Sequence, residues 1–132
     1  MDDVFAFECS VAGWGDSGSV VNARSAGRAK STYLSDLRDS YPEIPYTLIR
    51  CRKLGAPRSS DEFLRTAEYR GMPGLRCGAR VRVGEASGVV VGHNSSANFD
   101  VLFDDDAPRH AGLTLNVHPS EIVVARPSRA EE

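Results

Sequence analysis

Alternation of apolar and polar residues is the dominant pattern in the C-terminal half of the chain. Five short runs follow it, separated by turn-forming residues, and they span 78–84, 88–92, 99–103, 113–117 and 122–124. Short strands at such close spacing are typical of a small, closed or nearly closed barrel. The pattern therefore predicts a five-stranded barrel over residues 78–125.

The N-terminal part combines alternation with one stretch of helical spacing. A strand is predicted over 4–11, and one of its sides is uniformly apolar, with Phe5, Phe7, Cys9 and Val11. Further strands are predicted over 19–23 and 46–53, and apolar residues spaced three and four apart predict a helix between residues 25 and 42. This order predicts a lobe formed by residues 1–56, in which one helix packs across a three-stranded sheet.

A second helix is predicted between these two parts. Ser59 and Glu62 have the spacing of a capping box, in which a serine caps the helix and a glutamate follows three residues later. The helix extends to about Arg70, and Gly71 is suited to the left-handed conformation that ends many helices. We interpret residues 57–77 as a linking helix and connector, and 126–132 as a flexible tail. The whole chain is thus predicted to be α+β.

Composition excludes several classes of protein. The chain has 132 residues and a net charge of −2, which fits one ordinary domain or two very small ones and not a strongly basic protein. The acidic N-terminus and the lack of a long apolar run argue against a signal peptide and a membrane span. Cys9, Cys51 and Cys77 are odd in number and far apart, which argues against a disulfide framework and a zinc site. We expect a cytoplasmic protein with no membrane association, metal or cofactor.

A pattern of glycines and valines runs through the predicted barrel, at Gly78, Val81, Val83, Gly84, Gly88, Val89 and Val90. It resembles a KOW motif in an SH3-like barrel. The resemblance implies that this part of the chain contacts RNA, ribosomal components or other proteins.

A second resemblance covers the predicted N-terminal lobe, from Val4 to Lys53. It lies in the predicted hairpin and in the segments at 23–31, 39–42 and 49–52. These are similar to small uncharacterised proteins of tailed phages and prophages. The resemblance implies a viral or mobile-element origin and the cytoplasm of a bacterial host, and it assigns no catalytic residue. Inhibition of a host defence system or takeover of a host complex is the kind of activity that this resemblance implies.

Basic residues gather at two places in the predicted N-terminal lobe. One group surrounds the start of the first helix and the other follows the third strand, and together they are Arg24, Arg28, Lys30, Arg50, Arg52 and Lys53. Cations at a helix N-terminus oppose the helix dipole, and they become favourable where a phosphate or carboxylate binds. These residues are candidates for binding an anion or a partner. The alternative is that they are solvated charges, neutralised by nearby acidic residues.

Trp14 and an acidic run are the remaining candidates. Trp14 lies in a glycine-rich loop and is either an exposed interface anchor or part of the core. Asp104, Asp105 and Asp106 predict an acidic interaction loop, which either competes with nucleic acid for a basic partner or is a plain hairpin loop. The run lacks the ligand spacing of an EF-hand.

The chain carries no recognised signature of catalysis. It has no Gly-x-Ser-x-Gly, no phosphate-binding glycine loop and no His-Glu-x-x-His. We therefore predict a non-enzymatic binding protein that acts on a host protein. The alternative is a nucleic-acid-binding module that uses the basic side of the N-terminal lobe. The sequence leaves the partner's identity and the oligomeric state open.

Overall fold

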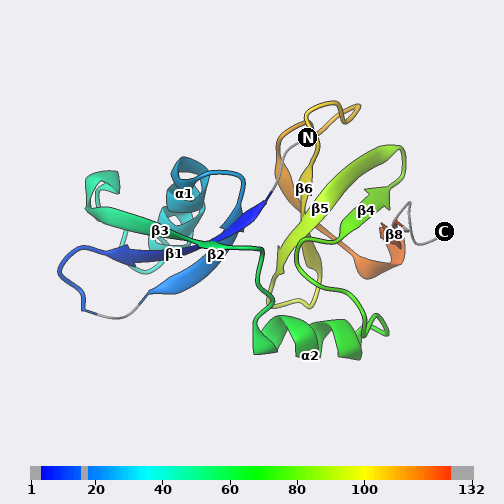
Figure 1. Ribbon diagram of the computed structural model, residues 1–132, viewed down its shortest axis with the longest axis horizontal. Helices are drawn as coiled ribbons and strands as arrows, with labels where there is room; N and C mark the ends of the chain where they lie inside the picture. Colours follow the sequence, from blue (N-terminus) through cyan, green and yellow to red (C-terminus); the bar gives the residue numbers. More distant parts are fainter. Residues whose placement is uncertain (1–3, 16–17, 126–132) are drawn as a thin grey trace. The chain divides into compact units, whose positions relative to one another are not determined.

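A computed structural model describes residues 4–15 and 18–125 of the chain (Figure 1). The chain divides into two compact units, Met1–Arg58 and Ser59–Glu132, which are called the first and the second unit below. Each unit combines one α-helix with one antiparallel sheet, so the predicted α+β class is confirmed. The acidic N-terminus and the tail predicted over 126–132 lie outside the described residues.

The first unit has the predicted order of strand, strand, helix and strand. Its elements are β1 (Phe5–Val11), β2 (Ser19–Ala23), α1 (Ala26–Leu37), the 3-10 helix η1 (Tyr46–Leu48) and β3 (Ile49–Gly55). The strands form one sheet in the order β2-β1-β3. The third strand begins later than predicted, because Pro45 starts a tight turn in which the Leu48 N–H donates to the Pro45 carbonyl oxygen at 3.1 Å.

One face of this sheet is covered by α1. Phe7, Cys9 and Val11 of β1 are buried there with Ala29, Tyr33 and Leu34 of α1, as the alternation along β1 predicts. The opposite, open face receives the intervening residues, and register pairs place Glu8 beside Arg52 and Ser10 beside Arg50. The helix begins where Ser25 caps it by accepting from the Arg28 N–H at 3.2 Å.

The second unit contains the five predicted strands. Its elements are α2 (Asp61–Tyr69), β4 (Arg80–Val83), β5 (Ala86–His93), β6 (Phe99–Phe103), β7 (Thr114–Val117), the 3-10 helix η2 (Pro119–Glu121) and β8 (Val123–Val124). The strand order is β7-β6-β5-β4-β8. Within the described residues the two outer strands, β7 and β8, do not pair with each other, so the sheet is open rather than a closed barrel.

Helix α2 packs on the core of the second unit. Phe63 and Ala67 are buried there together with Val90, Phe99 and other residues of the sheet. The helix therefore belongs to this unit by its packing, and the role of residues 57–77 as a connector remains a prediction.

Both ends of α2 are fixed by hydrogen bonds. Ser60 and not Ser59 caps the helix, because the Ser60 Oγ accepts from the Phe63 N–H at 3.0 Å. The Ser59 Oγ accepts instead from the Cys77 N–H at 2.9 Å. At the C-terminal end Gly71 has a positive φ of 76°, and the Met72 N–H donates back to the Ala67 carbonyl, as in a Schellman motif.

Candidate functional site

The six predicted basic residues do not form one cluster. Arg50 and Arg52 lie on the open face of the three-stranded sheet, and both are exposed. Arg52 is already engaged there, because its Nη2 donates to the Glu8 Oε1 at 2.6 Å. The open face therefore carries both signs of charge.

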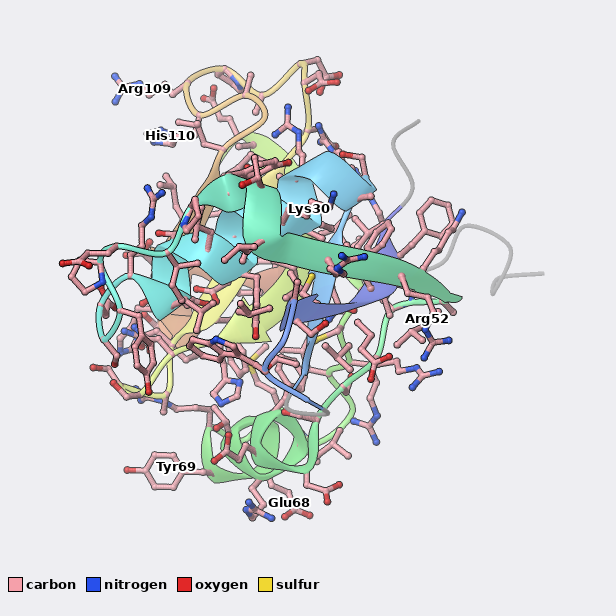
Figure 2. The ribbon with its side chains drawn as sticks, turned by 90° about the vertical axis from the view of Figure 1, so that its left-hand side faces the viewer. Lys30, Arg52, Glu68, Tyr69, Arg109 and His110 are labelled. Atoms are coloured by element: carbon pink, nitrogen blue, oxygen red, sulfur yellow. The ribbon has the colours of Figure 1, made fainter. Side chains whose placement is uncertain are left out.

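Lys30 and Lys53 belong to other parts of the first unit. The Lys53 Nζ lies 3.7 Å from the centre of the Phe5 ring, which packs against the core beneath α1. The Lys30 Nζ lies 5.9 Å from the centre of the Tyr46 ring. Both contacts are in the range of cation–π attraction. Figure 2 shows Lys30 and Arg52 at clearly separate places on this unit.

Arg24 and Arg28 lie at the start of α1, on either side of its cap. Ala23, directly before Arg24, pairs with Phe5, so these two arginines lie near the end of the sheet where β1 begins. No acidic side chain lies in the first turn of α1. The predicted basic residues are thus spread over the helix start, the helix-covered face and the open face. That they bind an anion remains a prediction.

Exposed aromatic residues gather at the other end of this sheet, where β1 finishes and β3 begins. Trp14 is 41% exposed, and its ring meets that of Tyr41, itself 51% exposed, edge-on with centroids 5.0 Å apart. The Ala12 N–H donates to the Leu48 carbonyl oxygen at 2.8 Å, which holds the loop after β1 against η1. Figure 1 shows this loop and η1 at the same end of the sheet. We call the four exposed residues at this end the aromatic patch: Trp14, Tyr41, Tyr46 and Leu48.

The exposure of Trp14 speaks against a place in the core, while its role as an interface anchor remains a prediction. The side chain is not part of the buried core, and it lies beside a second exposed aromatic ring. The sequence signals Trp14 by its glycine-rich loop. Tyr46 is predicted, with Trp14, to be available for stacking. Tyr41 and Leu48 were missed as surface residues, because their apolar character suits a helix stripe or a strand equally well.

The acidic loop is partly used within the second unit. The two terminal nitrogens of Arg80, Nη1 and Nη2, donate to the Asp104 carboxylate, the first at 3.0 Å. This pair connects the start of β4 to the end of β6. The hydrogen bond to Asp104 raises the pKa of Arg80 above its usual range, and the charges of Asp104 and Asp106 add to this effect. Asp104 is therefore engaged within the second unit, and the interaction loop of Asp104, Asp105 and Asp106 remains a prediction.

A polar cleft in the second unit was not foreseen from the sequence. It lies between α2 and the loop joining β5 to β6, and its volume is about 610 Å³; the lining includes Glu62, Arg65, Thr66, Tyr69, His93 and Asn94. Arg70 fixes the loop by donating to the carbonyl oxygens of Ala97 and Ser96, at 3.0 and 3.2 Å. Tyr69 is 78% exposed and projects from the helix (Figure 2).

Two cysteines of the first unit also come together, although 42 positions separate them in sequence. Cys9 and Cys51 are partners on β1 and β3, and their Sγ atoms lie 3.3 Å apart. Burial, the hydrogen bond with Cys51 and the charge of Cys51 raise the pKa of Cys9 to about 12. Burial and the nearby Cys9 also raise the pKa of Tyr33. Neither the number nor the spacing of the cysteines indicates this contact, because it depends on strand register.

Residues 4–15 and 18–125 hold no group of three His, Cys, Asp or Glu side chains placed to bind a metal ion. In the same part of the chain, neither helix has the length and apolar character needed to cross a membrane. Fold and surface together define an α+β chain of two units with an aromatic patch on the first. Comparisons with protein-family models, curated proteins and solved structures find no significant match to this chain.

Proposed function

We propose that this chain is a non-enzymatic binding protein that recognises another protein through the aromatic patch. The observation that carries the proposal is the exposure of Trp14, Tyr41, Tyr46 and Leu48 at one end of the first sheet. Large apolar side chains exposed together mark interaction sites more often than isolated ones do. Tryptophan and tyrosine are also the residues most enriched among interface hot spots.

The charges of the first unit favour a protein partner over a nucleic acid. Glu8 neutralises Arg52 on the open face, and Lys30 and Lys53 contact aromatic rings of their own unit. A polyanion binds through several cations on one side of a protein. These cations would first have to leave the carboxylate and the aromatic rings that they contact. A mixed surface with aromatic anchors is instead the usual composition of a protein interface.

The second unit is proposed to be an SH3-like barrel of the KOW type. The support is that β8, the last strand of this unit, pairs with β4, its first strand, and β4 also pairs with β5. Such pairing of the last strand with the first begins to close a small barrel. Gly88 supports the glycine pattern, because a Cβ atom there would lie 2.6 Å from the Leu102 carbonyl oxygen. Only glycine allows β5 and β6 to approach so closely without a shift.

A bacterial host protein is the proposed partner. This part of the proposal rests on the resemblance of residues 4–53 to small phage and prophage proteins, and it places the protein in the host cytoplasm. Inhibition of a host defence system is the activity that fits a small binding protein of such origin.

The test is capture of a partner by the full chain from nuclease-treated host lysate, with two matched variants. Trp14→Ser with Tyr46→Ser removes two anchors of the aromatic patch and is expected to abolish capture. Val20→Ser removes an equally exposed apolar residue elsewhere on the first sheet, and it is expected to leave capture intact. With the purified partner, loss of one hot-spot anchor should weaken binding at least about 30-fold. Equal capture by all three proteins would contradict the proposal.

Nucleic-acid binding is the second candidate, favoured by the two exposed arginines on the open face. Arg50 and Arg52 are two positions apart on β3, so both side chains point to the same side. If they contact phosphates, an electrophoretic shift should appear at low salt and weaken steeply as salt rises. Arg50→Gln with Arg52→Gln should flatten that dependence. The absence of any shift at about 50 mM salt would exclude this candidate.

A further inference from the structure

Two thiols face each other beneath α1 in the first unit. Cys9 and Cys51 are directly opposed in the antiparallel ladder of β1 and β3, with 3.3 Å between their Sγ atoms. Opposed residues on antiparallel strands have Cα atoms about 4.5–5.5 Å apart, which lies within the span of a disulfide. A small rotation of the side chains is then enough to bring the sulfurs into bonding distance. We propose that Cys9 and Cys51 are a redox pair that peroxide oxidises to a reversible cross-strand disulfide.

The two thiols differ in their access to an oxidant. Cys9 is fully buried, at 0% exposure, between the sheet and α1, whereas Cys51 is partly exposed at the margin of the same core. Lys30 of α1 lowers the pKa of Cys9 slightly, and Cys9 in turn raises the pKa of Tyr33 on the same helix. The high pKa of Cys9 keeps its thiol protonated at neutral pH. Peroxide therefore meets Cys51 first, and Cys9 serves as the resolving thiol.

The oxidation balances in two steps. The Cys51 thiolate attacks one oxygen of hydrogen peroxide, the O–O bond breaks, and hydroxide leaves while Cys51 becomes a sulfenic acid. The Cys9 sulfur then attacks the Cys51 sulfur, so that the S–S bond forms and the S–O bond breaks. The thiol proton of Cys9 leaves with the departing hydroxide as water. In total two thiols are oxidised by loss of two hydrogen atoms, and one peroxide is reduced to two waters.

The bond would tie together residues 42 positions apart within the first unit. A cross-link over such a loop restricts the unfolded chain far more than the folded one. We expect the melting temperature of the first unit to rise by on the order of 10 °C on oxidation. Cys77 belongs to the second unit, so it provides an internal reference thiol.

The experiment treats the reduced full chain with a stoichiometric amount of hydrogen peroxide and then alkylates the remaining thiols. Intact mass spectrometry should show that the chain has lost two hydrogen atoms. It should also show that only one alkyl group has been added, at Cys77. Peptide mapping without reductant should recover a peptide that links Cys9 to Cys51, and dithiothreitol should restore three alkylation sites.

Two variants sharpen this result. Cys77→Ala keeps the pair and should still lose two hydrogen atoms, whereas Cys51→Ala should not. Cys9→Ala should instead leave a sulfenic acid on Cys51 that dimedone traps. The proposal is overturned if the unsubstituted chain yields a sulfinic acid on Cys51 or cross-linked chains without the internal peptide. It is equally overturned if Cys9 and Cys51 both remain open to alkylation after unfolding.

Discussion

The two units distribute their apolar side chains differently. The second unit buries three phenylalanines in its core. Its exposed large apolar residues are scattered over three places: α2, the loop that precedes β7, and strand β8. In the first unit α1 covers one face of the sheet, and among the described residues four of the five exposed large apolar side chains gather where β1 ends and β3 begins. The second unit thus buries its phenylalanines and exposes Tyr69 on α2, whereas the first unit exposes Trp14, Tyr41 and Tyr46 at one end of its sheet.

Charged side chains extend the comparison. In the second unit Arg70 and Arg80 fix loops, the first through loop carbonyl oxygens and the second through Asp104. In the first unit Arg52 pairs with Glu8 at the surface, where both side chains remain largely in water. A charge count along the sequence therefore overstates the acidity that the second unit offers to a partner.

The largest expected effect comes from the core of the second unit. Phe63 is 1% exposed and packs against Phe99, with ring centroids 5.5 Å apart. Phe63→Ala should reduce the unfolding free energy of this unit by about 3–5 kcal/mol, because it removes buried area and leaves a cavity. Tyr41→Ala, on the exposed patch, should change stability by no more than about 0.5 kcal/mol. Urea unfolding followed residue by residue by NMR measures both, and comparable losses would break the comparison.

The next effect is a dependence of stability on pH, which the buried Cys9 gives to the first unit. Cys9 has its pKa raised from 9.0 to about 12 in the folded chain. The unfolded chain therefore releases this proton at lower pH than the folded chain does, so the stability of the first unit should fall as pH rises from 9 to about 12. Below pH 9 the contribution of this thiol is complete and constant. Melting curves of the reduced protein measure the fall.

Cys9→Ala is the control for this titration, because it removes the thiol and keeps a small apolar side chain. Tyr33 and Cys51 are coupled to Cys9 and change with it, whereas alkaline groups away from Cys9 contribute equally to both proteins. The loss of stability between pH 9 and about 12 should therefore be smaller in the variant. Identical slopes would contradict the burial of the Cys9 thiol against Cys51.

The smallest stability effect concerns the acidic loop. Asp104→Asn removes the charge that Arg80 meets and should cost about 0.5–1 kcal/mol, since the pair is partly open to solvent. Asp106→Asn is the matched control, because Asp106 acts on Arg80 only through its charge. The difference between the two variants should shrink in high salt. A larger loss for Asp106→Asn in thermal unfolding would be evidence against the role of Asp104.

The sequence predicts the elements well, because each follows from local chemistry. Alternation places Phe7, Cys9 and Val11 on the covered face of β1, and Gly71 ends α2 as expected. The strand predicted from residue 46 starts too early, since the turn that Pro45 begins outweighs the strand preference of Tyr46 to Leu48.

The candidate site was predictable only in part, because it depends on which distant residues become neighbours. Strand register brings Cys9 to Cys51 and Glu8 to Arg52, and no local pattern fixes that register. The same register spreads the basic residues over different faces, although they look like two clusters along the chain. Trp14 was found because one glycine-rich loop carries it, whereas its neighbour Tyr41 comes from a separate segment.

Fluorine NMR on Trp14 tests the binding proposal most directly. The chain has one tryptophan, so incorporation of fluorotryptophan places a single probe within the aromatic patch. The proposed function predicts that its resonance shifts and broadens when the captured host protein is added, and that single- or double-stranded oligonucleotides leave it unchanged. The proposed function would be contradicted if the bound partner left the chemical shift of this resonance unchanged. It would also be contradicted if only an oligonucleotide changed that shift.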